Sequence, residues 1–98
     1  MTRAEAIEKL NRSADRIHKL GATALYVFGS VARDELAPDS DVDIFIDYDP
    51  DGPFSFVELI RLQRLLAQIL ERDVDLTTRA GLHPVLKEEI ERSSIRVL

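Results

Sequence analysis

The stretch from Gly29 to Asp47, GSVARDELAPDSDVDIFID, runs from a glycine–serine turn into two aspartates and then into an apolar run. If residues 41–47 form a β-strand, Asp41 and Asp43 project from the same face of the sheet, because side chains alternate along a strand. Two carboxylates placed in this way repel each other unless a cation lies between them. The stretch therefore predicts a strand that carries a divalent metal ion and, with it, a nucleoside triphosphate.

The periodicity of the remaining chain predicts strands separated by helices, which is the pattern of an α/β sheet with helical cover. Two capping boxes, Thr2 with Glu5 and Ser55 with Glu58, begin the two longer helices. The first of these helices ends near Gly21. We expect strands over 23–28, 41–47, 73–78 and, at the C-terminus, 95–98, two short helical turns over 30–36, a helix from 55 to about 70, and a short helix from residue 84. Apolar spacing predicts that the second long helix buries Phe56, Leu59, Ile60, Leu66 and Ile69, and that the last helix buries Leu86 and Ile90.

The alternation along the strands also predicts which side chains share a face of the sheet. The face under the helices takes the apolar residues Val42, Ile44, Ile46, Val74 and Leu76. If the second and third strands are neighbours, Asp75 joins Asp41 and Asp43 on the other face. Phe45 falls on the carboxylate face as well, and the pattern gives no reason for it. Asp73 has the same facing as Asp75; we favour Asp75, which apolar residues flank on both sides, and the choice stays open.

Three carboxylates on a rigid sheet suit a hard metal ion. Mg²⁺ takes oxygen ligands and usually keeps positions for substrate phosphates. Two Mg²⁺ ions held by Asp41, Asp43 and Asp75 could activate an attacking oxygen and neutralise a leaving pyrophosphate. Asp75 is the candidate that helps to deprotonate the nucleophile.

Gly29, Ser30 and Arg33 are the residues expected to bind the triphosphate. Gly29 lets the backbone approach closely, and Ser30 begins a helical turn whose free N–H groups attract anions. Arg33 lies one turn further on and could bind a phosphate oxygen. The alternative for Arg33 is an ordinary ion pair with Asp34 or Glu35 in solvent.

Composition limits the possible functions. The chain has 98 residues, no cysteine and a net charge of −5, so we expect one domain over residues 1–98 without a disulfide or a thiolate metal site. No apolar run approaches the roughly 18 residues of a membrane span, and the N-terminus lacks a secretory signal pattern. We therefore expect a cytoplasmic protein without membrane contact. The negative charge disfavours a groove for long nucleic acid.

Two alternative functions remain open at this point. Residues 47–58, DYDPDGPFSFVE, match the calcium-loop pattern D-x-D-x-D-G-x5-E. An EF-hand loop lies between two helices, whereas a strand is expected before this segment, and the capping box already uses Glu58. The other alternative is a catalytically idle module that silences a partner protein by binding alone.

The chain resembles the polymerase-β-like nucleotidyltransferase superfamily in three motifs, namely Gly29-Ser30, Asp41-Val42-Asp43 and Asp75 within VDL. More narrowly, the segments GSVAR, SDVDIFID, VDL and LHPVLKEEI resemble the minimal nucleotidyltransferases, the MntA-type antitoxins, over nearly the whole chain. Two positions depart from the family pattern. Asp34 stands where glycine often follows the arginine, and Glu71 stands where glycine often precedes the third strand.

The resemblance implies a small mixed β-sheet with helices packed on one face. It implies a Mg²⁺-dependent enzyme that moves AMP from ATP onto a protein hydroxyl, with pyrophosphate leaving. The implied partner is a HEPN-type toxin, which such antitoxins silence by adding AMP to a tyrosine. The implied catalytic and metal-binding residues are Asp41, Asp43 and Asp75, and the implied phosphate-binding residues are Gly29, Ser30 and Arg33.

Overall fold

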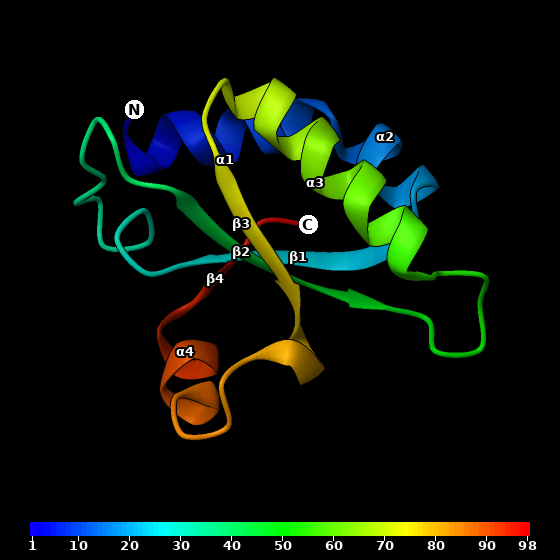
Figure 1. Cartoon of the computed structure of the whole chain (residues 1–98). Coiled ribbons are helices and arrows are strands. Elements are labelled where there is room, and N and C mark those ends of the chain that lie inside the picture. The colour runs from blue at the N-terminus through cyan, green and yellow to red at the C-terminus, as the bar shows by residue number, and fades with distance from the viewer.

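Four strands form a mixed sheet at the centre of the computed structural model, which describes residues 1–98 (Figure 1). They are β1 Ala22–Phe28, β2 Val42–Tyr48, β3 Val74–Thr78 and β4 Ile95–Arg96, in the spatial order β3-β2-β1-β4. β1 pairs antiparallel with β2 and with β4, whereas β2 and β3 run parallel. The predicted α+β class with a small mixed sheet is confirmed.

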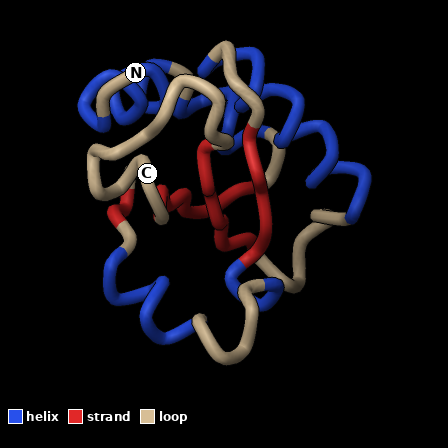
Figure 2. Tube along the Cα trace, turned by 60° about the vertical axis from the view of Figure 1, so that its left-hand side comes forward, coloured by secondary structure: helices blue, strands red, loops and turns tan.

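Three helices cover one face of the sheet, namely α1 Arg3–Arg12, α2 Ala14–Lys19 and α3 Phe56–Leu70 (Figure 1). A short 3-10 helix, η1 Arg79–Gly81, follows β3, and α4 Lys87–Ser93 lies on the opposite side of the sheet (Figures 1 and 2). The parallel pairing of β2 with β3 requires a crossover connection, which α3 supplies. None of the helices combines the length and the apolar character that a membrane span needs.

Both predicted capping boxes are present. The Thr2 amide donates to Glu5 Oε1 at 3.0 Å and the Glu5 amide donates to Thr2 Oγ1 at 3.1 Å. Ser55 and Glu58 form the same reciprocal pair at the start of α3. The prediction of a single helix up to Gly21 is wrong. Ser13, with φ −106° and ψ 18°, leaves the helical conformation, so the segment consists of two helices, α1 and α2.

The core lies between the sheet and the three covering helices. Its fully buried side chains are Ala6, Leu10, Ile17, Leu25, Val27, Val42, Ile44, Ile46, Leu62 and Leu66. The β2 residues among them and Val74 on β3 are buried as the strand alternation predicts, and Leu76 is half-buried. Each large aliphatic side chain buried in this way contributes about 1.5–3 kcal/mol, so the helical face supplies most of the energy that holds the sheet.

Two predicted helix faces differ from the observed ones. In α3 Leu66 is buried as predicted, and Leu59 and Ile69 are half-buried against the core. Phe56 is 73% exposed and Ile60 is 38% exposed, because the fully buried residues of the helix are Leu62, Leu65, Leu66 and Leu70. Leu86 is 48% exposed, because residues 84–86 form a turn in front of α4 instead of its first turn.

The opposite face of the sheet carries a small aromatic cluster, which explains Phe45. Phe45 is fully buried and stacks on Tyr26, with ring centroids 4.6 Å apart and an angle of 8° between the ring planes. The Arg79 guanidinium lies 4.9 Å from the Tyr26 centroid and 5.0 Å from the Phe45 centroid. Its cation therefore closes this part of the face over the negative sides of both rings.

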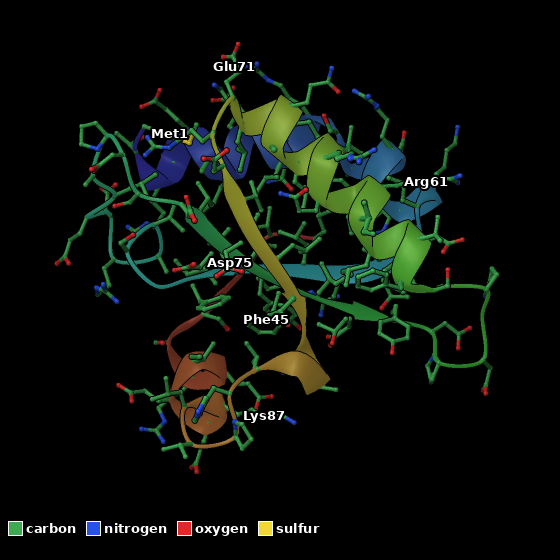
Figure 3. All side chains as sticks on the ribbon, viewed as in Figure 1. Met1, Phe45, Arg61, Glu71, Asp75 and Lys87 are labelled. Carbon is green, nitrogen blue, oxygen red and sulfur yellow. The ribbon has the colours of Figure 1, made fainter.

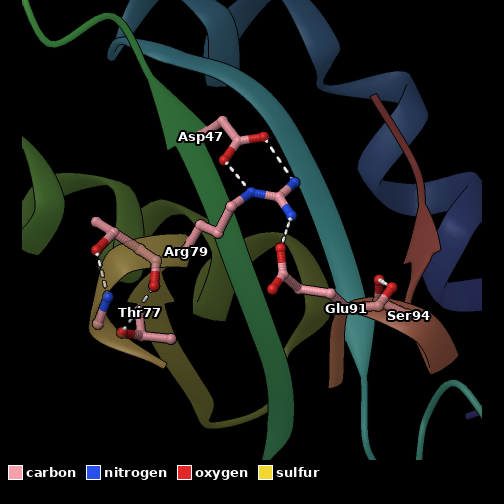
Figure 4. A network of polar contacts seen from close by, with 7 residues as sticks. Asp47, Thr77, Arg79, Glu91 and Ser94 are labelled. Atoms are coloured by element: carbon pink, nitrogen blue, oxygen red, sulfur yellow. Dashed lines mark hydrogen bonds and ion pairs between the residues drawn. The ribbon is translucent and has the colours of Figure 1, made fainter. Parts of the chain in front are cut away.

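Arg79 also connects three elements through its guanidinium (Figure 4). It donates two hydrogen bonds to Asp47 on β2, at 2.8 and 2.9 Å, and pairs with Glu91 on α4. These hydrogen bonds hold the pKa of the Asp47 carboxyl below its usual value and raise the pKa of Arg79. A forked arginine–carboxylate pair is one of the strong polar contacts in proteins, so η1 and α4 are fixed to the end of β2.

The calcium-loop alternative is therefore wrong. Its first acidic residue, Asp47, lies within β2 and pairs with Arg79. Its last acidic residue, Glu58, is held by Ser55 in the capping box. The segment 47–58 connects a strand to a helix, whereas an EF-hand loop connects two helices.

Asp34 and Glu71 are the two non-glycine residues with positive φ, at 58° and 54°. They occupy the two positions at which the resemblance leads one to expect glycine, whose missing Cβ makes this conformation easy. The Asp34 carboxylate accepts a hydrogen bond from the Arg3 amide at 2.8 Å. Glu71, the C-cap of α3, has only a 4.0 Å contact with Lys9. The strain at Asp34 is thus partly compensated, and the strain at Glu71 is not.

Glu71→Gly should raise the free energy of unfolding by about 0.5–1 kcal/mol, because it removes a Cβ from a left-handed helix cap. Asp34→Gly should gain less, because it also removes the carboxylate that accepts from Arg3. Urea unfolding of the wild type and both variants, followed by circular dichroism, measures the two effects. A Glu71→Gly variant less stable than the wild type would contradict the assignment of strain to this cap.

Candidate active site

The pairing of β2 with β3 brings two of the predicted carboxylates together. Asp43 and Asp75 are Cα partners in the parallel register, so their side chains leave the same face of the sheet, about 4.8 Å apart in the direction of the strand spacing. Asp41 lies one residue before β2. Asp41 and Asp75 are exposed and Asp43 is half-buried. Figure 3 shows Asp75 and Phe45 near the middle of the sheet, between the upper helices and α4.

The carboxylate face is open only at the end where β2 begins. A row here means the residues that are Cα partners across neighbouring strands. The first row on this face consists of Asp75 on β3, Asp43 on β2 and Phe28 on β1. The next row contains the buried Phe45, which lies under Arg79. The accessible part of this face is therefore the first row, with α4 and η1 closing the sheet beyond it.

The three carboxylates act on one another electrostatically. Burial, the charge of Asp75 and the charge of Asp41, in that order, raise the pKa of the Asp43 carboxyl above its usual value, and the charge of Arg33 opposes them. No hydrogen bond or ion pair within the chain reaches the carboxylates of Asp41, Asp43 or Asp75. A cation placed among them would remove this repulsion.

Asp73, the alternative third carboxylate, lies in a different place. It precedes β3, and its backbone carbonyl accepts from the Val42 amide at 3.0 Å. It lines a surface hollow that Asp41 also borders and Asp43 does not, and its charge is not among those that shift the pKa of Asp43. The geometry favours Asp75 as the partner of Asp43.

Gly29 packs its backbone directly against the Asp43 carboxylate. It adopts φ +68°, and a Cβ added to it would lie 2.4 Å from Asp43 Oδ2. Only glycine combines this conformation with this approach. The end of β1 and the carboxylate site on β2 are therefore in contact through a residue that cannot carry a side chain.

Residues 29–35 form a compact turn beside the carboxylates, in place of the two predicted helical turns. Its hydrogen bonds run from Arg33 N to Gly29 O (3.3 Å), Asp34 N to Val31 O (3.1 Å) and Glu35 N to Ser30 O (2.8 Å). Val31 and Ala32 are buried and anchor the turn in the core. The amides of residues 30–32 donate to no protein acceptor. Successive free N–H groups of this kind bind anions.

Arg33 forms the surface ion pair that was one of its two predicted alternatives. Its Nε lies 3.2 Å from Glu35 Oε2, and the two side chains are 61% and 66% exposed. A pair this exposed contributes little free energy, so it does not fix the guanidinium. The charge of Arg33 also acts on Asp43, which leaves the arginine within reach of an anion bound at the turn.

Three arginines around the site are absent from the residues predicted from the sequence. Arg3 donates through Nη1 to the Ala32 carbonyl at 3.1 Å, and Arg72 donates to backbone carbonyls of the loop 37–40. Arg79 holds α4 in place. Each of these arginines contacts residues more than ten positions away, so no local spacing in the sequence signals them.

Comparison with known proteins identifies the class of this chain. A family model described as "Nucleotidyltransferase domain" matches residues 7–97. The chain belongs to the nucleotidyltransferase family.

Two curated relatives of this nucleotidyltransferase carry the names of protein-modifying enzymes. "Putative protein adenylyltransferase MJ0126" of Methanocaldococcus jannaschii is 37% identical over 94 residues, which cover 95% of this chain and 92% of the relative. "Protein adenylyltransferase MntA" of Thermococcus cleftensis is 33% identical over 79 residues, which cover 81% of this chain and 78% of the relative.

Solved structures confirm the predicted fold of a minimal nucleotidyltransferase. One that is described as a minimal nucleotidyltransferase superposes with a TM-score of 0.83 at 29% identity, over 97% of this chain and 95% of the other. The Shewanella oneidensis complex of a tri-AMPylated HEPN toxin with an MNT antitoxin gives a TM-score of 0.58 at 23% identity, over 91% of this chain and 70% of the other. The second match shows the fold alone.

The donor set of this nucleotidyltransferase suits Mg²⁺. No three His, Asp or Glu side chains lie close enough together to hold a metal ion by themselves. However, Asp43 and Asp75 adjoin in register, Asp41 follows a loop next to them, and all the available donors are oxygens. Mg²⁺ is commonly bound by one or two carboxylates, with waters and substrate phosphates completing its shell. Asp43 and Asp75 are thus the pair that could hold it, with Asp41, at the end of the loop beside them, as a further oxygen donor.

Asp43→Asn should stabilise the metal-free protein at pH 7, because it removes a carboxylate whose pKa is raised in the folded state. A raised pKa means that the folded state binds the proton more tightly than the unfolded state. The wild type therefore loses stability as the pH rises from the ordinary aspartate pKa of 3.8 through the raised pKa, and the gain of the variant should disappear below that window. We expect a gain below about 1 kcal/mol at pH 7, since solvent screens a half-exposed group. Melting temperatures at pH 3.5 and pH 7 in chelator measure it. A large loss of stability at pH 7 would show that Asp43 has a structural role.

Gly29→Ala should lower the free energy of unfolding by about 1–3 kcal/mol, because alanine there has a strained φ and a Cβ against Asp43. It should also weaken ATP binding at least about tenfold, since the Asp43 carboxylate must move. Thermal unfolding and calorimetric titration with Mg-ATP measure both effects. Gly52→Ala is the matched control, because Gly52 has no positive φ and its nearest contact is 3.3 Å. Equal effects of the two substitutions would contradict the special role of Gly29.

Proposed function

We propose that this nucleotidyltransferase transfers AMP from ATP onto a hydroxyl of a partner protein. The proposed acceptor is a tyrosine of a HEPN-type toxin, which the chain would silence as its antitoxin. The observation that carries the proposal is the register pairing of Asp43 with Asp75 next to a turn with three free amides. One half of this arrangement suits a cation and the other half suits an anion, and a metal-bound triphosphate presents both.

The relatives support a protein as the acceptor. MJ0126 and MntA, each similar to this chain over more than three quarters of its length, carry the name protein adenylyltransferase. The Shewanella complex pairs an antitoxin of this fold with an AMPylated HEPN toxin. The same chemistry in this chain would use the open row of its carboxylate face.

The strand order suggests the side from which each substrate approaches. The turn 29–35 follows β1, on one side of Asp43, and Asp75 lies on β3, which is the edge strand on the other side. The triphosphate would lie over the turn, where the amides of residues 30–32, the Ser30 hydroxyl and Arg33 bind its phosphates. The acceptor would then enter over β3.

In the proposed reaction the acceptor oxygen attacks the α-phosphorus of ATP. A new O–P bond forms, and the bond between this phosphorus and the oxygen bridging to the β-phosphate breaks, so pyrophosphate leaves with the bridging electrons. Asp75 accepts the proton of the hydroxyl, and Arg33 and the turn amides bind the departing pyrophosphate. Mg²⁺ bound by Asp41, Asp43 and Asp75 would neutralise the phosphate charge and lower the pKa of the acceptor hydroxyl.

The alternative is an antitoxin that silences its partner by contact alone. The carboxylates of the open row would then have no function, although their charges repel one another in the free protein. The two hypotheses differ in whether the partner changes mass.

Asp41→Ala/Asp43→Ala should abolish AMP transfer, with a loss of at least about a hundredfold, because the reaction depends on positioning by these carboxylates. The test incubates the chain with a HEPN-type partner and Mg-ATP and weighs the partner by intact mass spectrometry. Wild type should add one or more AMP increments. Asp49→Ala/Asp51→Ala, which removes two exposed aspartates from the distant loop, is the matched control and should keep wild-type activity.

Neutralisation of the partner without a mass change, equally by wild type and by Asp41→Ala/Asp43→Ala, would contradict the transferase proposal. It would establish silencing by binding alone.

A further inference from the structure

The loop that carries Asp41 to the site is held from one side. Residues 37–41 connect the turn after β1 to the start of β2, and most of them are exposed. Residues 38–41, together with the end of α3 and the residues before β3, border a surface hollow of about 430 Å³. An exposed loop of this type is mobile unless its backbone groups are bound. The position of Asp41 therefore depends on what holds its loop.

Arg72 supplies that contact. Its Nη2 donates to the Ala37 carbonyl at 2.5 Å and to the Ser40 carbonyl at 2.9 Å. These two carbonyls lie 35 and 32 positions earlier in the chain. A single guanidinium nitrogen therefore bridges both ends of the tight turn that the Ser40 amide closes onto the Ala37 carbonyl at 3.1 Å.

Arg72 does not form an ion pair with any of the carboxylates around it. Asp39, Asp41, Glu71 and Asp73 line the same hollow, yet the ion pairs of the chain do not include Arg72. Arg79, by contrast, binds two carboxylates. Because the hydrogen bonds of Arg72 go to carbonyls, it forms no ion pair with the carboxylates that line the same hollow.

The end of α3 directs Arg72 toward the loop. Glu71 adopts the left-handed conformation and turns the chain at the end of the helix, at the position that Figure 3 labels. The Arg72 amide closes the helix by donating to the Ala67 carbonyl at 3.2 Å. The next residue, Asp73, accepts from the Val42 amide at 3.0 Å. Arg72 thus binds the backbone before Asp41, and Asp73 binds the backbone amide of Val42 directly after it.

We propose that Arg72 is a positioning residue, whose guanidinium fixes the 37–41 loop so that Asp41 stays beside Asp43 and Asp75. The inference rests on the proposed function, in which Asp41 binds the metal ion. It concerns a residue that touches neither metal nor substrate and acts only through the backbone of the loop. Residues that orient metal ligands from outside typically change metal affinity or activity by 10- to 100-fold.

Arg72→Met tests the proposal, because methionine keeps an apolar stem of similar length and removes every donor. In the metal-free protein, amide hydrogen exchange at residues 40–42 should become at least about tenfold faster while exchange in β1 and α1 stays unchanged. The apparent Mg²⁺ affinity and kcat for AMP transfer should each fall about tenfold, with little change in KM for ATP. Arg64→Ala is the control and should change none of these values, because Arg64 is an exposed arginine of α3 that forms no ion pair.

Pro38→Gly is a second variant that does not depend on Arg72. Pro38 is exposed in the same loop, so glycine there loosens the loop without removing a core contact. It should change hydrogen exchange and Mg²⁺ affinity in the same direction as Arg72→Met. Unchanged exchange at residues 40–42 in Arg72→Met would overturn the inference, and so would Mg²⁺ affinity equal to that of Arg64→Ala. If the wild type itself transfers no AMP, the proposed function fails, while the exchange measurement still decides whether Arg72 holds the loop.

Discussion

The parallel pairing of β2 with β3 is the constraint on which the rest of the structure depends. Its register sets Val42 opposite Val74 and Asp43 opposite Asp75. Burial of the two valines under the helices fixes this register, because a shift by one residue would turn every side chain of a strand to the other face. The same alternation that builds the core therefore forces two carboxylates together on the opposite face. In this fold the core and the site cannot be specified independently.

The carboxylate face is divided by chemistry into a closed half and an open half. In the closed half, Arg79 neutralises Asp47 and covers Phe45. In the open half, the Asp43 and Asp75 carboxylates have no cationic partner from the chain to neutralise them. Arginine thus determines where an acidic residue becomes structural and where it stays available to a ligand, since a paired carboxylate has lost the interactions that a metal ion would need.

Local patterns were sufficient to predict the strands and both capping boxes, because each depends on alternation or on spacing within a few residues. The mixed sheet was implied by the family resemblance, and the convergence of Asp43 with Asp75 followed from alternation only on the condition that β2 and β3 are neighbours. Contacts between distant residues were not predictable in this way. Phe45 is covered by Arg79, which lies far away in the sequence. The turn at 29–35 does not continue as a helix, because Asp34 adopts a positive φ that the local sequence pattern does not predict. In α3 Leu66 is buried as predicted, whereas Phe56 and Ile60 are exposed, because the position at which the helix meets the sheet is set by tertiary packing.

The unpaired carboxylates have a thermodynamic consequence for the free protein. Burial and neighbouring charges raise the pKa of Asp43, so at neutral pH the ionised site opposes folding, while the helical core supplies the energy that holds it in place. A cation that binds the folded chain but not the unfolded chain adds RT ln(1 + [L]/Kd) to stability. Its binding also removes the repulsion, so the folded site gains more from the ion than isolated carboxylates would. The residues that weaken the free protein are therefore the ones that couple its stability to a ligand, which is the expected behaviour of a site maintained for binding rather than for folding.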